Sequence, residues 1–365
     1  MVLGADNGGG STFTGAFVSM PVKLFVFGVS AGLVALTIYF LVAGQDILIP
    51  IALAIMIWYL LNASARMFGR LTLGGRAVPY SVCLTASVLC FLAIVAFVVE
   101  MVSGNFGDVI NAAPLYEANL ERLIGKIARA LGFGDAPTVT QLVDQINFRS
   151  VISGIAGMIT NAAGNAGVIL IYVLFLLVEQ RSFNAKMTAI FPDREQLERV
   201  RGLLSQITQD IQTYVWIKTL MSLVTAGLSY MILLLVGVDY AEFWAIIIFL
   251  LNYIPTIGSL LGIVFPALLA LVQFESVVPF LIVTPALAVV QVVVGNLLEP
   301  RLMGQSLNLS PFIIIVSLAV WGALWGVAGM FLCVPLTVIA MIVFAHFERT
   351  RPVAVLLSSN GKIRY

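Results

Sequence analysis

The chain has 365 residues, of which 61% are hydrophobic and only 10% are charged, and its formal net charge is +1. Soluble domains carry about 25% charged residues. This composition, together with several apolar runs of about 18 residues or more, excludes a soluble domain and predicts an all-α polytopic membrane protein. A net charge so close to zero also gives no support to a nucleic-acid-binding surface, so we expect no nucleic acid as a partner.

Catalytic and metal-binding motifs are missing from the sequence. The chain has one histidine, His346, and three cysteines, and these residues lack the spacing of metal-ligand motifs. We find no Ser/His/Asp or Cys/His arrangement in the spans and no phosphate-binding glycine loop. We therefore expect no enzyme activity, no metal and no cofactor.

The first hundred residues are expected to form a tail and three membrane spans. Residues 1–20 are rich in Gly and Ser and are predicted to be a disordered cytoplasmic tail. Residues 21–102 hold the spans, at about 24–43, 47–63 and 80–102. The linker between the second and third spans, residues 64–79, carries three arginines and no acidic residue. The positive-inside rule therefore places this linker in the cytoplasm.

The middle of the chain is predicted to leave the membrane twice. Residues 103–150 are expected to form a small extracytoplasmic helical region that packs subunits together. Span four follows at 151–178. Residues 179–213 are predicted to be a cytoplasmic amphipathic helix, in which Asp193 is the expected N-cap and Gln196 its capping-box partner.

Residues 214–348 are predicted to form the transport core, which begins with a span at 214–236. Lys218 lies near the inner end of this span, where its long side chain is expected to reach the membrane interface. The next apolar stretch, residues 241–273, is interrupted by the sequence NYIPTIGS. Each flanking segment has about 12 to 15 residues, fewer than a bilayer crossing needs, so we expect a re-entrant hairpin or a broken span.

The break in this hairpin must face protein or a water-filled cavity, because unpaired backbone groups are not tolerated in lipid. Its polar and conformationally special residues are therefore candidates for the substrate pathway. Pro255 and Gly258 could also serve only to bend the chain. The candidates are Asn252, Pro255, Thr256, Gly258 and Ser259.

The next span is predicted at 277–297 and contributes two further candidate pathway residues. Gln291 lies within it and Asn296 lies at its inner end. Polar side chains at membrane depth are costly and commonly mark a pathway. Both amides could equally serve only to satisfy neighbouring backbone groups.

A second hairpin is predicted at 311–346, with Trp321 and Trp325 near its tip. These two aromatic side chains are candidate pathway residues, because they could form a wall on which a substrate stacks. The alternative is that they belong to the aromatic belt of a membrane interface. Residues 349–365 are basic and are predicted to be a cytoplasmic tail.

A polar segment, residues 295–311, separates the two last apolar stretches. Within it Glu299 and Arg301 flank Pro300. We expect Glu299 and Arg301 to form an ion pair that closes the inner mouth of the pathway. A fixed positive neighbour favours the ionised carboxylate, so this arrangement argues against Glu299 as a proton site. The alternative is a loop that only joins two spans.

Several short motifs in the second half of the chain resemble those of a known family. They are YIPTIG at 253–258, NLLEPRLMG at 296–304, LSP at 309–311, WG at 321–322 and 325–326, and PL at 335–336. In order and spacing they resemble the autoinducer-2 exporter family of bacterial permeases, also called the PerM family. The resemblance is carried by residues 190–348 and rests on segment layout further upstream.

The resemblance implies a helical permease of the bacterial inner membrane that forms a homo-oligomer, with a pentamer as one candidate assembly. It also implies export of the quorum-sensing signal autoinducer-2, while some family members are assigned sodium/proton antiport. The expected partners are thus a small polar solute, the lipid bilayer and further copies of the chain. The charge distribution places both termini in the cytoplasm.

Three functions remain open from the sequence. A secondary or passive transporter exporting a small polar solute is favoured, because the core is rich in Asn, Gln, Ser and Thr but almost free of charge. A cation/proton antiporter usually needs a carboxylate deep in a span, and Glu299, at a predicted span edge, is the sole candidate. A non-transporting oligomeric scaffold is the third, and flux measurements across a proton gradient would separate the three.

Overall fold

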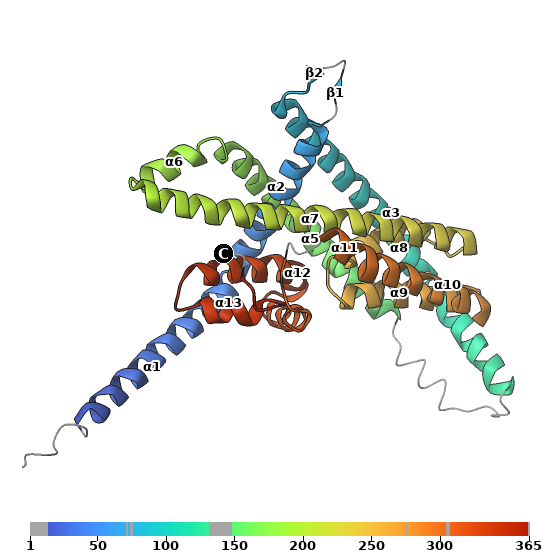
Figure 1. Ribbon diagram of the computed structural model, residues 1–365. Coiled ribbons are helices and arrows are strands. Elements are labelled where there is room, and N and C mark those ends of the chain that lie inside the picture. Colours follow the sequence, from blue (N-terminus) through green and yellow to red (C-terminus); the bar gives the residue numbers. More distant parts are fainter. Residues whose placement is uncertain are drawn as a thin grey trace, which may run out of the picture. The chain divides into compact units, whose positions relative to one another are not determined.

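The computed structural model describes residues 14–70, 72–73, 76–130, 148–274, 276–303 and 307–363 (Figure 1). The chain divides into two compact units, residues 1–49 and 50–365, and the candidate site lies within the second. In chain order the elements are α1 (Thr14–Ala43), α2 (Gln45–Phe68), β1 (Thr72–Leu73), β2 (Arg76–Ala77), α3 (Tyr80–Ala130), α5 (Phe148–Glu179), α6 (Phe183–Ile190), α7 (Arg194–Val236), α8 (Ala241–Leu251), α9 (Ile257–Gln273), α10 (Val277–Gln291), the π-helix η1 (Val292–Leu298), α11 (Glu299–Met303), α12 (Pro311–His346) and α13 (Arg351–Leu357).

These helices confirm an all-α polytopic membrane protein. Among the described residues, five helices are long and apolar enough to cross a membrane, and α5 with α6, bent by 68°, makes a sixth candidate. The five are Gln45–Phe68, Tyr80–Met101, Arg194–Val236, Val277–Met303 and Pro311–His346. Helices α8 and α9 are apolar but have only 11 and 17 residues. The sequence predicts seven or eight segments because it counts such short pieces as well.

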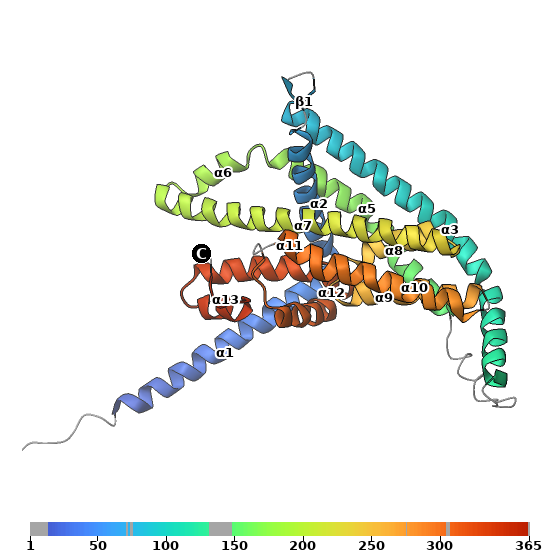
Figure 2. The same ribbon diagram turned by 45° about the vertical axis from the view of Figure 1, so that its right-hand side comes forward.

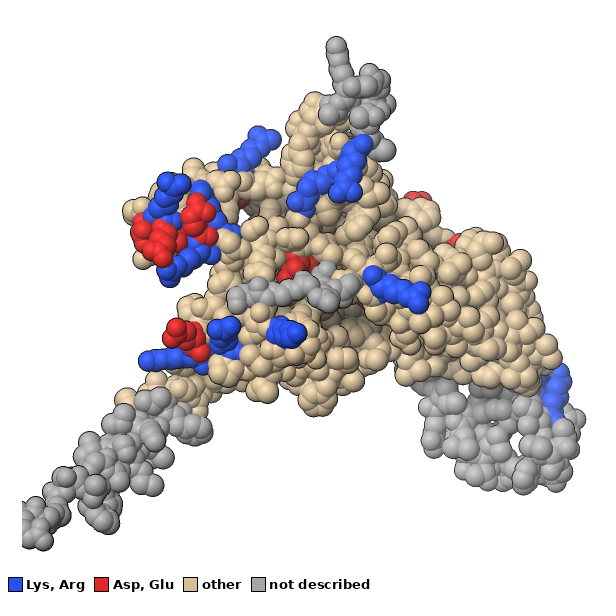
Figure 3. Space-filling model, in the orientation of Figure 1, with Lys and Arg blue, Asp and Glu red and all other residues tan. Residues whose placement is uncertain are grey.

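The surface agrees with this assignment. Figure 3 shows charged side chains gathered where α6 meets α7, at the left, whereas the face over α8 to α10, at the right, is almost free of charge. Large apolar side chains are exposed on α10 and at the end of α7: Leu281 is 61% exposed and Leu235 is 81% exposed. A continuous apolar surface of this kind fits contact with lipid.

The N-terminal helix is longer than the sequence predicts. Helix α1 begins at Thr14, so the predicted disordered tail of residues 1–20 does not extend over residues 14–20. Apolar residues such as Phe17 and Val18 continue the composition of the first span towards the N-terminus, which favours helix there. Residues 1–13 lie outside the described residues.

Helix α3 joins two predicted elements into one helix of 51 residues. It contains the predicted span at 80–102 and continues without a break into the region 103–150, because no turn sequence separates them. Its far end packs against the α8–α9 hairpin, where the Tyr116 hydroxyl donates to the Asp239 carboxylate at 3.1 Å. Burial and the nearby charge of Asp239 raise the pKa of Tyr116, so its phenol remains a donor. Residues 131–147 lie outside the described residues, and subunit packing by this region stays a prediction.

Replacing Tyr116 with Phe is expected to lower the free energy of unfolding by about 1 kcal/mol, because the change removes one hydrogen bond and keeps the buried ring. The matched control is Tyr230→Phe, whose hydroxyl donates to Glu242 at 3.3 Å at the surface. Water replaces that bond, so the control should change stability by less than about 0.5 kcal/mol. Thermal unfolding of the purified protein in detergent measures both, and equal shifts would contradict the packing of α3 on the hairpin.

Helix α7 organises the second unit. It has 43 residues and is therefore about 65 Å long, twice the thickness of a bilayer core. The Asp193 side chain accepts from the backbone N–H of Glu195 at 3.2 Å, which confirms the predicted N-cap. Along its length α7 packs against α8, α10, α11 and α12, and Figure 2 shows it running beside the last three. The predicted amphipathic helix within 179–213 and the predicted span at 214–236 are thus joined in one continuous helix.

Two helical hairpins follow the same plan. Helices α8 and α9 pack on each other and are joined by residues 252–256. Helix α12 is interrupted by non-helical backbone at Trp325 (φ −126°, ψ 15°) and Gly326 (φ 59°, ψ −138°), which divides it into two legs. The positive φ at the second of these positions favours glycine. Both interruptions fall where the sequence predicts a break.

Each hairpin depends on a glycine that lies directly against the carbonyl of a residue on the opposite leg. A Cβ atom on Gly258 would lie 1.7 Å from the Leu251 carbonyl oxygen. A Cβ atom on Gly329 would lie 1.9 Å from the Trp321 carbonyl oxygen. No side chain fits at either distance, so the close approach of the two legs requires glycine.

The polar segment, residues 295–311, is mostly helical in its first half. Helix α10 continues through η1 into α11 and ends at Met303, so Val277–Met303 forms one candidate span. Residues 304–306 lie outside the described residues. The loop that follows is held by the C-terminal segment: the Ser310 N–H donates to the Leu357 carbonyl at 3.0 Å. The predicted tail 349–365 therefore forms α13 and packs on α12.

Candidate functional site

A buried polar stripe runs along the membrane half of α7. Its members recur at steps of four, three and four residues, so they share one face of the helix. They are Lys218, Ser222, Thr225 and Ser229, and none is more than 7% exposed. Burying such groups inside an apolar helix is costly unless they find partners. Sequence reasoning missed this stripe, although its helical spacing was available as a signal.

The tip of the α8–α9 hairpin covers this stripe. The Asn252 side-chain amide donates to the Ser222 hydroxyl at 3.0 Å, and both side chains are buried. The hydroxyls of Tyr253 and Thr219 are hydrogen-bonded at 2.6 Å. On its other side the Tyr253 ring stacks on Phe331 of α12, with centroids 4.6 Å apart and planes 22° apart. The two hairpins therefore meet beside the polar face of α7.

The other candidate residues of this turn differ in exposure. Gly258 is buried, Pro255 and Ser259 are half-buried, and Thr256 is exposed. Thr256 has φ 57° and ψ −57°, a backbone conformation that is strained for a β-branched side chain. Strained backbone is commonly kept where a site needs it, and here it lies between Asn252 and the first turn of α9.

Gln291 is the candidate residue with the most unusual environment. Its side chain is buried, and its Oε1 atom has no hydrogen-bond partner. Its Nε2 atom lies against α9, 3.3 Å from where a Cβ on Gly262 would be. A buried carbonyl without a partner costs about 1–3 kcal/mol, and such an atom is a natural contact for a transported solute. Asn296, about one turn later, is exposed and does not join it.

A π-helix begins immediately after Gln291. It covers Val292–Leu298, and at its end the backbone N–H of Glu299 donates to the carbonyl of Val294, five residues earlier. Bonding at this longer interval widens the turn and shifts the following side chains around the helix axis. Segments of this kind occur frequently at functional sites. Here the shift places Glu299 beside α7.

Glu299 pairs with Lys218. The Lys218 Nζ atom lies 2.7 Å and 3.0 Å from the two Glu299 carboxylate oxygens, and the side chains are only 8% and 14% exposed. The predicted pairing of Glu299 with Arg301 is therefore wrong. Residues two apart on a helix point to different sides, and Arg301 is exposed. The expectation that Lys218 reaches the membrane interface is wrong for the same reason, since its ammonium group is held inside.

Trp321 and Trp325 lie together inside the second hairpin, with ring centroids 5.3 Å apart. The Trp321 indole N–H donates to the Thr337 hydroxyl at 3.2 Å and so ties one leg to the other. Trp325 is 7% exposed. A buried Trp325 does not fit an interfacial belt, whereas a place beside the hairpin tip remains compatible with a wall of the pathway.

We define the polar cluster as the residues that these contacts bring together on α7, the α8–α9 turn and the α10–α11 segment. They are Lys218, Thr219, Ser222, Asn252, Tyr253 and Glu299, and we add Gln291, whose buried side chain lies against α9. Hydroxyl, amide and phenol groups dominate it, and its only charges neutralise each other. Such a site can hydrogen-bond a small polar solute at little electrostatic cost.

Comparison with known proteins decides the family. A family model described as AI-2E family transporter matches residues 31–349. The chain belongs to the AI-2E transporter family. The resemblance found in the motifs of its second half is thereby confirmed, and the match also covers part of the first predicted span and all of the second and third, where those motifs are lacking.

Several bacterial proteins named as transport proteins or permeases are similar to the chain over much of its length. YhhT of Escherichia coli K12 is 30% identical over 319 residues, which cover 86% of this chain and 89% of that protein. TqsA of the same organism, named as an AI-2 transport protein, is 28% identical over 326 residues, covering 87% and 91%. PerM of Escherichia coli K12 is 27% identical over 219 residues, covering 58% and 62%. The chain is thus a membrane transporter of this family.

Proposed function

We propose that this protein is a secondary or passive transporter that exports a small polar solute, autoinducer-2 or a similar signal, through the polar cluster. The observation that carries the proposal is the meeting of the α8–α9 tip with the second leg of α12 beside the buried polar face of α7, where Tyr253 contacts Thr219 and Phe331. Transporters often place interrupted helices around their substrate site. The AI-2 transport protein TqsA supplies the candidate solute.

Within this proposal Asn252, Ser222 and Gln291 bind the solute, because their hydrogen-bonding groups are buried and suit an uncharged polyol. Thr256 and Ser259 line the approach, and Gly258 and Pro255 shape the turn. Trp321 and Trp325 form a wall beside the second hairpin, and Asn296 lies towards the inner end. The protein would act in the bacterial inner membrane as a homo-oligomer, a pentamer among the candidates, with both termini in the cytoplasm.

A second candidate function, cation/proton antiport, gains support from the Lys218–Glu299 pair. Glu299 is not at a water-filled edge but 14% exposed between helices, beside a buried ammonium group. Ionisable residues inside membrane helices commonly serve ion pathways and proton relays. A largely buried carboxylate of this kind is what a cation/proton antiporter would need, whereas the sequence predicts Glu299 at a span edge.

Replacing Gln291 with Met is expected to change stability and transport in opposite directions. Met has a similar volume and removes the buried carbonyl without a partner, so the free energy of unfolding should rise by about 1 kcal/mol. Loss of one hydrogen bond to the solute should slow transport about tenfold. Thermal unfolding and efflux from proteoliposomes measure the two effects.

The matched control is Thr284→Val on the same helix, two turns earlier. The Thr284 hydroxyl donates to the Phe280 carbonyl within its own helix, at 2.7 Å, so it is not available to a solute. Neither the transport rate nor the free energy of unfolding of the Thr284→Val protein should change by much. A Gln291→Met protein that is less stable but transports normally would show that this amide has only a structural role.

The transport proposal itself is tested in proteoliposomes with autoinducer-2 as the solute. One set has no ion gradient, one has a pH gradient and one has a sodium gradient. Flux of autoinducer-2 down its own concentration gradient, without an ion gradient, supports a passive transporter. Acceleration of this flux by a pH gradient supports coupled export. Sodium movement driven by pH without solute flux would favour the antiporter. If neither autoinducer-2 nor sodium moves in any set, both the exporter and the antiporter are overturned, and the non-transporting oligomeric scaffold is the function that remains.

A further inference from the structure

A second site lies apart from the polar cluster, between the end of α2 and the first half of α7. It is a cavity of about 540 Å3, lined by ten side chains. They are Ala63, Arg66, Met67, Arg70, Ser205, Thr208, Gln209, Gln212, Thr213 and Trp216. The lining combines two arginines with hydroxyl and amide groups and contains no acidic residue. Such a set of donors suits an oxyanion.

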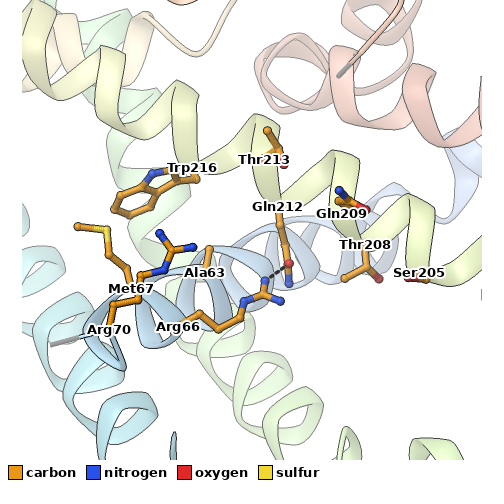
Figure 4. A pocket seen from close by; sticks show the side chains of 10 residues that line it. All are labelled: Ala63, Arg66, Met67, Arg70, Ser205, Thr208, Gln209, Gln212, Thr213 and Trp216. Carbon is orange, nitrogen blue, oxygen red and sulfur yellow. Dashed lines mark hydrogen bonds between the residues drawn. The ribbon is translucent and has the colours of Figure 1, made fainter. Parts of the chain in front are cut away.

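The two arginines point into the same space (Figure 4). Arg66 donates to the Gln212 side-chain oxygen across the cavity, which fixes its guanidinium against α7. Arg70 extends towards Trp216 and makes no ion pair with any described residue. Both side chains are exposed, so water screens the repulsion between them and an anion can approach both. Their arrangement therefore suits an external negative charge.

The surroundings indicate what carries that charge. Arg66 and Arg70 lie at the end of a candidate span, in the linker that the positive-inside rule places in the cytoplasm. Met67, between them in sequence, is 48% exposed. Basic pockets between membrane helices on this side bind the phosphate of anionic lipid headgroups. A neighbouring exposed apolar side chain gives the acyl chains a surface to follow.

We propose that the cavity between α2 and α7 binds a phosphate group, held by Arg66 and Arg70 and by the hydroxyl and amide donors of α7. The same chemistry could come from an anionic phospholipid of the inner leaflet or from a soluble phosphate. The open position at the membrane edge favours the lipid. Helix α7 also carries residues of the polar cluster and contacts both hairpins. Binding of a lipid in the cavity would therefore couple the position of α7 to the lipid composition of the membrane. This phosphate-binding proposal does not depend on which solute the protein transports.

Native mass spectrometry of the full-length protein in detergent tests the proposal. Phosphatidylglycerol, phosphatidylcholine and inorganic phosphate are added separately, and binding per chain is measured. We expect phosphatidylglycerol to bind and to raise the Tm, phosphatidylcholine to bind far less, and inorganic phosphate to compete only weakly. Strong competition by inorganic phosphate would instead assign the site to a soluble phosphate. Equal binding of both lipids would overturn the proposal.

The decisive variant is Arg66→Gln with Arg70→Gln, which should weaken phosphatidylglycerol binding at least about tenfold. The matched control, Arg181→Gln with Arg349→Gln, removes the same charge from two exposed positions outside the cavity and should leave binding unchanged. Because Arg66 also bonds Gln212, the single variant Arg70→Gln keeps the test valid if the double variant folds poorly. Equal loss in the variant and control proteins would show a general charge effect and overturn the site.

Discussion

Changing Glu299 to Gln, or Lys218 to Met, is expected to destabilise the protein by about 3–5 kcal/mol, the cost of leaving one buried charge without its partner. Both side chains are less than 15% exposed, and their charged atoms are 2.7 Å apart. Both are held between α7 and α11, so little of either side chain contacts water. The loss is measured as a fall in Tm of the purified protein and in the yield of folded protein.

The double variant Lys218→Met with Glu299→Gln should recover most of this stability, since a neutral pair of similar volume removes both desolvation costs. The matched control is Arg301→Ala, two residues from Glu299 but exposed. It should change stability by less than about 0.5 kcal/mol. If Arg301→Ala were as damaging as Glu299→Gln while Lys218→Met was harmless, the pairing partner would be Arg301 after all.

The same double variant separates the two candidate functions. A gate that depends on the ion pair would transport the solute in the double variant with altered rate but unchanged response to a pH gradient. A carboxylate that carries protons would lose the pH-driven component entirely while facilitated flux remained. Because the folded state is restored, either outcome reports on mechanism rather than on folding.

Much of the fold could be predicted from local patterns. The interruption at 252–258 is visible because Pro255 and Gly258 stand inside an otherwise apolar stretch, and neither leg is long enough to span alone. The N-cap at Asp193 could be predicted because capping depends on residues only a few positions apart. Each of these features is decided by neighbours in sequence.

The chemistry of the site depends on distant residues and was harder to predict. Glu299 and Lys218 are 81 positions apart, so their pairing follows from how α11 packs on α7. The π-helix before Glu299 changes the direction in which the Glu299 side chain points, and no pattern in the sequence VVVGNLL predicts that change. The α7 stripe is the exception: Lys218, Ser222, Thr225 and Ser229 have helical spacing, and a search for polar periodicity inside apolar helices would have found them.

Placing an alanine at Gly258 or at Gly329 is expected to cost more than about 3 kcal/mol, above the usual range for overpacking. In each case the new Cβ would meet a backbone carbonyl at less than 2 Å, at Leu251 O and Trp321 O respectively. A side-chain neighbour could rotate away, but a carbonyl within a hairpin leg cannot, so the legs must separate. Opening the first hairpin would also pull Asn252 and Tyr253 away from α7.

The matched control is Gly227→Ala, in the membrane half of α7, where no atom lies within 4 Å of the added Cβ. This change should be neutral or stabilising, because alanine is the better helix former by about 1 kcal/mol. Size-exclusion profiles, Tm and transport rate measure all three variants side by side. Normal folding of Gly258→Ala together with Gly329→Ala would mean that the legs do not approach as closely as described, and the meeting of the two hairpins beside the polar cluster would have to be abandoned with it.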